Sequence, residues 1–527
     1  MPAKSASPTA RIGTNAATQM GARILYMLTR LAVPPAVLSQ VSLEEYGIWS
    51  ICFIVISYLG MSAFGISNVY IRQVAHINAT GGLERVSQLL STGLALTLPT
   101  VAALMGLLWF LVPWVVQTFA IEPALADTAS FLILGTALVF CLDLSFGAFA
   151  YILHGLQLIA RHTAIWTLSF LVEIVLIMLF LQVGWGIYSL LLAFAARYAI
   201  SISLSAYACF RALPGLSIHP RHIRRSTIRQ FTGFGAIVQL TGILSILLNS
   251  VEKMVAGAFL GVQATGLFEI GQKLPIMGSQ ITSSLNAVFL PAAAHLHSSA
   301  QKATLLHLYV KGSRYVSLLN GYIMGFLASF APYLLSVWLG DTHDLADAAF
   351  LMALFTLPNH LNVLTGPGSA MHRGSGRPGR ELRYPILQAA IAAVALAAAW
   401  AWDGLSIHSI GLAIAFSMGS SALVYLYWTN RQIGADQGIF WRQVLAPGLA
   451  PYGLGFGLFQ AVSGSLEIAA LTRWEMAAVL AVCGAIYTAF NVLAFGCLCC
   501  DAGEKRQIGA QINPFLERLH IAPVLNR

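Results

Sequence analysis

Charged side chains stand inside long apolar stretches of this sequence, where a charge is costly. The stretch ILLNSVEKMVAGAF, residues 246–259, contains Glu252 and Lys253 side by side, and the next stretch contains Glu269 and Lys273. Residues four apart lie one helical turn from each other, so Glu269 and Lys273 can pair. Adjacent residues point about 100° apart on a helix. Glu252 and Lys253 must therefore face different surroundings.

Further charges occur in other apolar stretches. Arg23 and Arg30 in the first stretch are seven residues apart and share one helix face. Arg30 has no acidic residue on its own helix turns. Asp143, Glu173 and Arg197 stand in three later stretches. A charge near the middle of a membrane costs roughly 2.5 to 3.5 kcal/mol, so these side chains are expected to share an interior cavity.

The chemistry of such a cavity depends on which charges lack a partner. Basic side chains without a counter-charge favour an anion, and phosphate or pyrophosphate is the anion that most needs help in crossing hydrocarbon. We therefore expect Arg30 and Lys253 to bind substrate. Carboxylates can carry a coupling proton or sodium ion, and the candidates are Glu252, Glu269 and Asp143. The alternative is that these charges only neutralise one another through internal salt bridges.

The composition indicates which elements position these residues. Of the 527 residues, 57% are hydrophobic and 9% are charged, whereas about 25% are charged in a soluble domain. The mean hydropathy is +0.75. Apolar stretches of about 20 residues, each long enough to cross a bilayer as a helix, recur along the chain. We predict an all-α integral membrane protein with about 14 transmembrane helices and no removable signal peptide.

The connections between these helices alternate in charge. Acidic connections include SLEEYG (42–47) and LGDTHDLAD (339–347), and basic ones include HRGSGRPGRELR (372–383). Because Lys and Arg are retained on the cytoplasmic side, both termini are predicted to be cytoplasmic. Among the basic residues, only Arg473 is placed in an outer loop.

An internal repeat indicates the domain organisation. Gly47–Trp49 and Gly266–Phe268 open two spans and are related by the same offset as Pro113 and Pro332. Parallel repeats of six helices form two lobes around a central cleft. The predicted parts are an N-terminal lobe, a basic cytoplasmic linker, a C-terminal lobe, an extra helix pair and a cytoplasmic tail, at residues 1–214, 215–228, 229–432, 433–500 and 501–527.

Two segments resemble a known family. They are LEEYGIWSICFIVISYLGMSAFGISNVYIRQVA (43–75) and NSVEKMVAGAFLGVQATGLFEIGQKLPIMGSQITSSLNAVFLPAAAHLH (249–297). Both resemble the half-signatures of bacterial polysaccharide flippases, the O-antigen and exopolysaccharide transporters of the multidrug/oligosaccharidyl-lipid/polysaccharide superfamily. The resemblance implies two MATE-like lobes around a cationic cavity. It also implies transport of an oligosaccharide on a polyprenyl pyrophosphate carrier from the inner to the outer face of the bacterial cytoplasmic (inner) membrane.

The resemblance also implies roles for single residues. Arg23 and Arg30 match the family's arginines in the first span, and Lys273 matches a basic position, so the cationic cavity is expected to include Arg23, Arg30, Lys253 and Lys273. Lys253 is expected to face the pyrophosphate. Glu252 stands where the family commonly has Asp, and is expected to face Lys273 or the coupling path. A polysaccharide polymerase and assembly proteins are the partners implied.

Other functions remain open. A peptidoglycan-precursor flippase shares this fold. A cation-coupled multidrug antiporter of the same superfamily would prefer an acidic cavity, which the arginines of the first span oppose. A membrane glycan ligase or polymerase would need a large outer loop with catalytic groups, whereas every predicted outer loop is short. We therefore expect a transporter that is not an enzyme.

Several binding partners are not expected. The formal charge of +9 is spread over many inner loops, without the interleaved aromatic residues of a nucleic-acid surface. The sequence contains no P-loop and no HExxH motif, so we predict no cofactor and no metal site. Aromatic residues that could stack on sugar rings, or simply pack, are Tyr26, Trp49, Tyr58, Tyr70 and Trp166.

Overall fold

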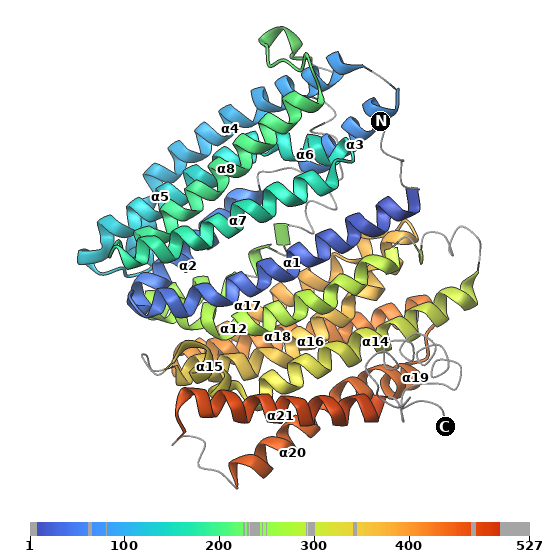
Figure 1. The fold of residues 1–527 in the computed structure, drawn as a ribbon. Helices are drawn as coiled ribbons and strands as arrows, with labels where there is room; N and C mark the ends of the chain where they lie inside the picture. The colour runs from blue at the N-terminus through green and yellow to red at the C-terminus, as the bar shows by residue number, and fades with distance from the viewer. Residues whose placement is uncertain are drawn as a thin grey trace, which may run out of the picture. The chain divides into compact units, whose positions relative to one another are not determined.

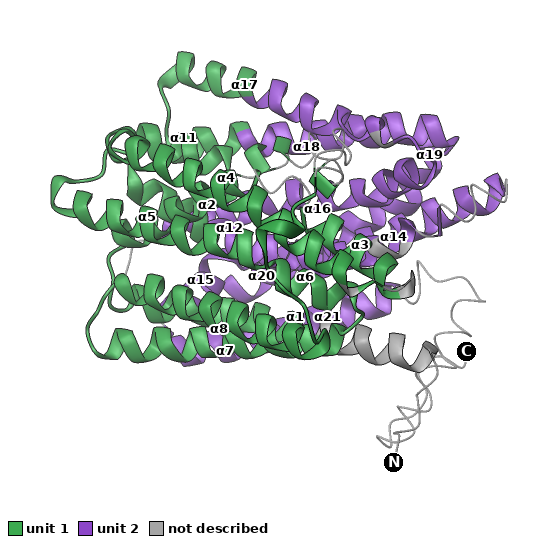
Figure 2. Cartoon of the chain, turned by 90° about the horizontal axis from the view of Figure 1, so that it is seen from above, with its two compact units in different colours: residues 1–270, 341–344, 393–413 green, residues 271–340, 345–392, 414–527 purple. Residues whose placement is uncertain are grey.

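The described part of the chain is helical, and no strand occurs in it (Figure 1). The structure, a computed structural model, describes residues 8–61, 66–80, 82–224, 227–228, 231, 243–244, 246–248, 250–290, 292–293, 301–340, 345–464 and 471–495. The chain forms two compact units, coloured separately in Figure 2. The predicted all-α class is therefore confirmed.

The first unit comprises residues 1–270, 341–344 and 393–413. Long helices pack side by side in it, with α1 against α7, α7 against α8, and α4 and α8 against α5 (Figure 1). Its helices are α1 (Pro8–Leu38), α2 (Leu43–Gly60), α3 (Ile66–Thr80), α4 (Leu83–Thr118), α5 (Pro123–Phe146), α6 (Ala148–Gly155), α7 (Ile159–Gln182), α8 (Tyr188–Ala212) and α11 (Val251–Leu260).

The second unit comprises residues 271–340, 345–392 and 414–527. Its helices include α14 (Lys302–Ser329), α15 (Ala331–Leu339), α16 (Ala346–Gly374), α19 (Gln437–Phe440), α20 (Ala446–Ser463) and α21 (Arg473–Ala494). Three helices contribute residues to both units, namely α12 (Val262–Ser283), α17 (Arg383–Asp403) and α18 (Ile407–Ile433). The predicted boundaries of the two six-helix lobes stay a prediction.

The described helices include many that fit a membrane. Nine of them are long and apolar enough to cross it, or ten if the bent pair α14 and α15 is one span. Large apolar side chains such as Trp109, Phe110 and Trp402 are exposed, as expected for side chains that face lipid. The chain is therefore a multi-pass membrane protein. The count of about 14 spans and the cytoplasmic position of both termini stay predictions.

The acidic connection SLEEYG starts helix α2 through a capping box. The Ser42 hydroxyl accepts a hydrogen bond from the Glu45 amide, and the Glu45 carboxylate accepts one from the Ser42 amide. These bonds satisfy two amide groups that have no partner within the helix. The same motif occurs at Thr472 and Glu475, where α21 begins. Two connections that the charge pattern places outside the membrane therefore also set the starts of helices.

The first part of the predicted linker is fixed to helix α4. The backbone amides of Ser217 and His219 each donate to a serine hydroxyl of α4, Ser87 and Ser91, over 3.2 Å. The Arg224 amide donates to the Thr92 hydroxyl at the same distance. This linker segment is therefore attached to the first unit up to Arg224.

Small residues bring α14 and α20 close together in the second unit. Gly321 of α14 faces the carbonyl of Gly448 in α20, with no room for a Cβ. A Cβ at Gly325 would lie 2.9 Å from Pro451 and from Tyr452. Helices in membranes commonly associate through such small residues, because these let the backbones approach closely. The predicted extra helix pair thus begins with a helix that packs tightly on α14.

Arg473 explains why one basic residue stands in a predicted outer loop. Its guanidinium donates to the carbonyls of Val337 and Trp338, over 2.9 Å each. These carbonyls belong to the last turn of α15, which ends at Gly340 with φ of 79°. The last carbonyls of a helix lack intrahelical partners and carry partial negative charge. Arg473 therefore caps α15 and ties the start of α21 to it.

We predict that Arg473→Gln destabilises the second unit. The two carbonyls lose a charged donor, which costs about 1 kcal/mol at an exposed position. Thermal unfolding of the detergent-solubilised protein should shift down by a few degrees. Arg442→Gln, at an exposed arginine of the same unit, is the control that should melt like the wild type. Equal melting of both variants would contradict the capping role.

Candidate functional site

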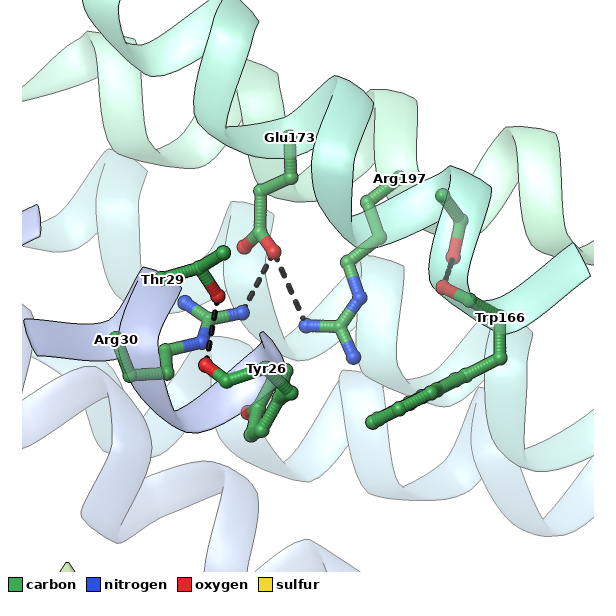
Figure 3. A network of polar contacts seen from close by, with 7 residues as sticks. Tyr26, Thr29, Arg30, Trp166, Glu173 and Arg197 are labelled. Carbon is green, nitrogen blue, oxygen red and sulfur yellow. Dashed lines mark hydrogen bonds and ion pairs between the residues drawn. The ribbon is translucent and has the colours of Figure 1, made fainter. Parts of the chain in front are cut away.

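One buried carboxylate in the first unit binds two arginines. Glu173 Oε2 of α7 lies 2.6 Å from Arg30 Nη2 of α1 and 3.3 Å from Arg197 Nη1 of α8 (Figure 3). The exposed fraction of the side chain is 3% for Glu173, 21% for Arg30 and 11% for Arg197. Asp143 of α5 lies within electrostatic range of Arg197. The guanidiniums are thus brought together by carboxylates from two other helices.

Aromatic rings line the same place. The guanidinium carbon of Arg30 lies 4.9 Å from the centre of the Tyr26 ring, and that of Arg197 lies 5.8 Å from it. Tyr26 in turn contacts Trp166, with ring centres 5.1 Å apart, and Phe170, at 5.4 Å. Cations are attracted to aromatic faces, so the rings help to position both arginines.

The sequence of α7 accounts for this arrangement. Trp166, Phe170 and Glu173 are separated by four and three residues, so they lie on one helix face. Arg30 lies one turn after Tyr26 on α1, which places the ring beneath its guanidinium. One face of α7 therefore presents both the aromatic rings and the carboxylate to α1.

A second ion pair lies in the same unit. Lys253 Nζ of α11 binds Glu269 Oε2 of α12. The Lys253 and Glu269 side chains are 13% and 19% exposed. The buried hydroxyl of Tyr46 in α2 lies within electrostatic range of Arg30, Lys253 and Glu269. The Arg30 and Lys253 ion pairs therefore both lie within electrostatic range of one buried hydroxyl.

Comparison with known proteins decides the family. The sequence profile described as Polysaccharide biosynthesis protein matches residues 40–346, more than half of the chain. The chain belongs to the polysaccharide biosynthesis protein family. No curated protein matches this family member.

Solved structures establish the fold of this family member. An inward-facing multidrug resistance MATE family transporter of the MOP superfamily aligns with a TM-score of 0.67 and 15% identity, over 80% of this chain and 98% of that one. The Lipid II flippase MurJ, in an inward closed conformation, aligns with a TM-score of 0.65 and 13% identity, over 92% of this chain and 98% of that one. A MOP superfamily transporter from Pyrococcus furiosus aligns with a TM-score of 0.58 and 16% identity, over 81% of this chain and 95% of that one. The predicted MATE-like fold is thus confirmed.

The expectation that Arg30 lacks a counter-charge is wrong. Its partner Glu173 lies 143 residues away in sequence, so the turns of its own helix could not reveal it. Lys253 likewise pairs with Glu269. The alternative of internal salt bridges therefore describes both basic residues in this structure, while their part in substrate binding stays a prediction.

The structure places the other predicted residues differently. Arg23 is exposed, and Asp143 is partly buried near Arg197. Glu252 is buried, 3% exposed, and lies within electrostatic range of Tyr58. Lys273 is partly buried in α12, in the second unit. Their predicted roles in substrate binding and ion coupling stay predictions.

Sequence reasoning placed Glu173 and Arg197 in the shared cavity without partners, named Tyr26 only as a ring that could stack on a sugar or pack, and did not single out Tyr46. Glu173 and Arg197 were recognisable as charges within apolar stretches, but nothing in their spacing joined them to Arg30. Tyr26 was recognisable by its position one turn before Arg30. Tyr46 stands among apolar residues and the charges of SLEEYG, and gave no signal.

We predict that Glu173→Gln destabilises the protein by about 3 kcal/mol, because two guanidiniums lose a buried counter-charge. The double variant Arg30→Met and Glu173→Met should lose less, since only Arg197 is then left without Glu173, and Asp143 remains within its electrostatic range. Thermal unfolding of the purified proteins measures the difference. A double variant as unstable as Glu173→Gln would show that the Arg30 and Glu173 pair is not the source of the loss.

Proposed function

We propose that this protein is a flippase that moves a polyprenyl-pyrophosphate-linked oligosaccharide from the inner to the outer leaflet of the bacterial cytoplasmic membrane. Membership of the polysaccharide biosynthesis protein family and the MOP transporter fold support this proposal. The lipid-linked oligosaccharide is the substrate, and a polysaccharide polymerase and assembly proteins are the proposed partners. The protein moves its substrate by alternating access without changing it chemically, so it is not an enzyme.

The observation that carries the proposal is the sharing of Glu173 by Arg30 and Arg197. Each guanidinium has five N–H donors, and each directs one nitrogen at Glu173. Arg30 Nε has no hydrogen-bond partner within the described residues. Most N–H donors of the two guanidiniums can therefore bind an anion. Guanidinium forks match the oxygens of a phosphate in pairs, and two forks suit a pyrophosphate.

The aromatic rings beside the arginines fit the sugar of the same substrate. Tyr26 and Trp166 are both partly buried and lie against each other. Flat aromatic faces stack on the apolar faces of sugar rings while their polar edges stay hydrated. In this proposal the pyrophosphate binds Arg30 and Arg197, and the first sugar packs on Tyr26 or Trp166.

The remaining predicted residues contribute charge to the proposed path. Lys253 and Lys273 add positive charge, and Arg23, which is exposed on α1, lies two turns before Arg30. Ion coupling by Glu252, Glu269 or Asp143, with a proton or sodium ion, is part of the proposal. Glu269 and Asp143 also balance Lys253 and Arg197, so replacing either carboxylate would disturb a basic neighbour as well.

One observation favours a second candidate. The alignment with the Lipid II flippase spans 92% of this chain, whereas that with the MATE transporter spans 80%. A peptidoglycan-precursor flippase is therefore the second candidate. A multidrug antiporter is less favoured, because the guanidinium N–H donors of Arg30 and Arg197 suit an anion and not a cationic drug.

We predict that the double variant Arg30→Met and Glu173→Met folds but does not transport. The net charge is unchanged and Asp143 remains near Arg197, so the protein should still fold, whereas the anion loses one guanidinium. Cells that depend on this variant should accumulate lipid-linked oligosaccharide on the cytoplasmic leaflet, with export reduced at least tenfold. Arg161→Gln, at an exposed arginine of the same unit, is the matched control. Full export by the double variant would refute the anion site.

The trapped lipid distinguishes the two candidates. In cells depleted of the protein, mass analysis of the accumulated lipid should find complete oligosaccharide units on a polyprenyl pyrophosphate carrier. Accumulation of a peptidoglycan precursor would favour the second candidate. Unchanged lipid-linked sugars together with altered sensitivity to cationic drugs would contradict both.

A further inference from the structure

Uncharged polar side chains form a buried cluster in the second unit. At most 1% of each of five side chains is exposed, and Tyr452 covers the cluster from α20. The members, on α14, α16 and α20, are Ser313, Ser317, Asn320, Thr356, His360 and Tyr452. We call these six residues the His360 cluster. The three helices that carry the cluster are apolar or tightly packed, so polar side chains buried between them need an explanation.

Contacts of His360 define the geometry of the cluster. Its Nε2 lies 3.0 Å from Ser317 Oγ. Its ring stacks on that of Tyr452, with centres 5.9 Å apart and planes inclined by 11°. A Cβ built on Gly321 would lie 3.0 Å from His360 Cε1. The glycine therefore lets α14 approach the imidazole closely.

Several polar atoms of the His360 cluster have no hydrogen-bond partner among the described residues. They are Ser313 Oγ, both side-chain heteroatoms of Asn320, His360 Nδ1 and Tyr452 Oη. Asn320 lies one helical turn beyond Ser317, and Ser313 one turn before it. Buried polar groups in proteins are almost always hydrogen-bonded. Such atoms on His360 and on the residues one turn from its partner Ser317 therefore indicate a site that binds a small polar species.

The surroundings of His360 are uncharged. Among the residues that the structure describes, it meets Ser317 and Gly321 from α14, and from α20 it meets Tyr452, whose phenol is titratable. A sodium ion in this site would have no carboxylate to balance its charge. Imidazole instead changes its own charge by binding one proton.

The cluster can stabilise a protonated imidazole. The Tyr452 ring offers its face to the cation, and the Ser317 hydroxyl, 3.0 Å from Nε2, is an acceptor for an imidazole N–H. We propose that the His360 cluster is a proton-binding site of the second unit, separate from the carboxylates of the first unit. Its use in driving transport rests on the proposed flippase function, whereas proton binding itself does not.

Proton binding is tested first, without any lipid substrate. The full-length protein, with ring-¹⁵N histidine, is titrated in lipid nanodiscs from about pH 8 to about pH 4. The signal absent from His360→Gln should show protonation of Nδ1 within this range, and Ser317→Ala should shift its midpoint. Should His360→Gln not fold, the signal that moves in Ser317→Ala identifies His360. A neutral imidazole throughout the range in folded protein, or a response to sodium instead of protons, would overturn the site.

Coupling is tested separately, in proteoliposomes with an imposed pH gradient. The probe is a fluorescent short-chain polyprenyl pyrophosphate oligosaccharide, and its leaflet ratio is measured. One coupled proton changes the attainable ratio about tenfold per unit of pH gradient. His360→Gln should lose this factor, and His307→Gln, at an exposed histidine of α14, should keep it. Flipping by the wild type that ignores the gradient would overturn coupling but leave the flippase function intact. No flipping at all would refute the flippase function, and the titration would still decide the proton site.

Discussion

The interior of the first unit depends on Glu173, which neutralises Arg30 and Arg197 together. A lone charge at membrane depth is costly, and each guanidinium would be unfavourable in its helix without this carboxylate. Glu173 therefore requires α1, α7 and α8 to remain adjacent, with the same faces turned inward. The ion pair between α1 and α7 also keeps Trp166 and Phe170 of α7 in contact with Tyr26 of α1.

The two units use different chemistry in their interiors. The first unit buries charged groups that balance one another, such as Arg30 with Glu173 and Lys253 with Glu269. The described core of the second unit instead contains neutral polar groups around His360 and close glycine contacts between α14 and α20. Charged groups suit the recognition of a charged lipid headgroup. A neutral polar site suits the smallest cation, the proton.

The sequence was sufficient for the fold class but not for the partners within the site. Long apolar stretches predict membrane helices directly, because the bilayer fixes their length and composition. The spacing of charges along one helix predicts that Glu269 and Lys273 can pair, but it does not predict the ion pair between Glu269 and Lys253. The partner of Arg30 lies 143 residues away. Such pairings depend on which helices are neighbours, and helix periodicity does not contain that information.

The His360 cluster could not be predicted from the sequence either. Asn320, Ser317 and His360 are ordinary polar residues in apolar stretches, and each taken alone could face a neighbouring backbone. Only the packing of α14 against α16 and α20 brings them together. Arg473, by contrast, was already unusual in the sequence as a basic residue in an outer loop, and its capping of α15 accounts for it.

The most direct test of the account is the affinity of the purified protein for a polyprenyl pyrophosphate, measured against the corresponding polyprenol. If the two guanidiniums beside Glu173 bind the headgroup, the wild type binds the pyrophosphate and not the alcohol. Arg197→Gln should then weaken binding of the pyrophosphate at least tenfold, whereas Arg161→Gln should leave it unchanged. Equal affinity for pyrophosphate and alcohol, or full affinity in Arg197→Gln, would contradict the account.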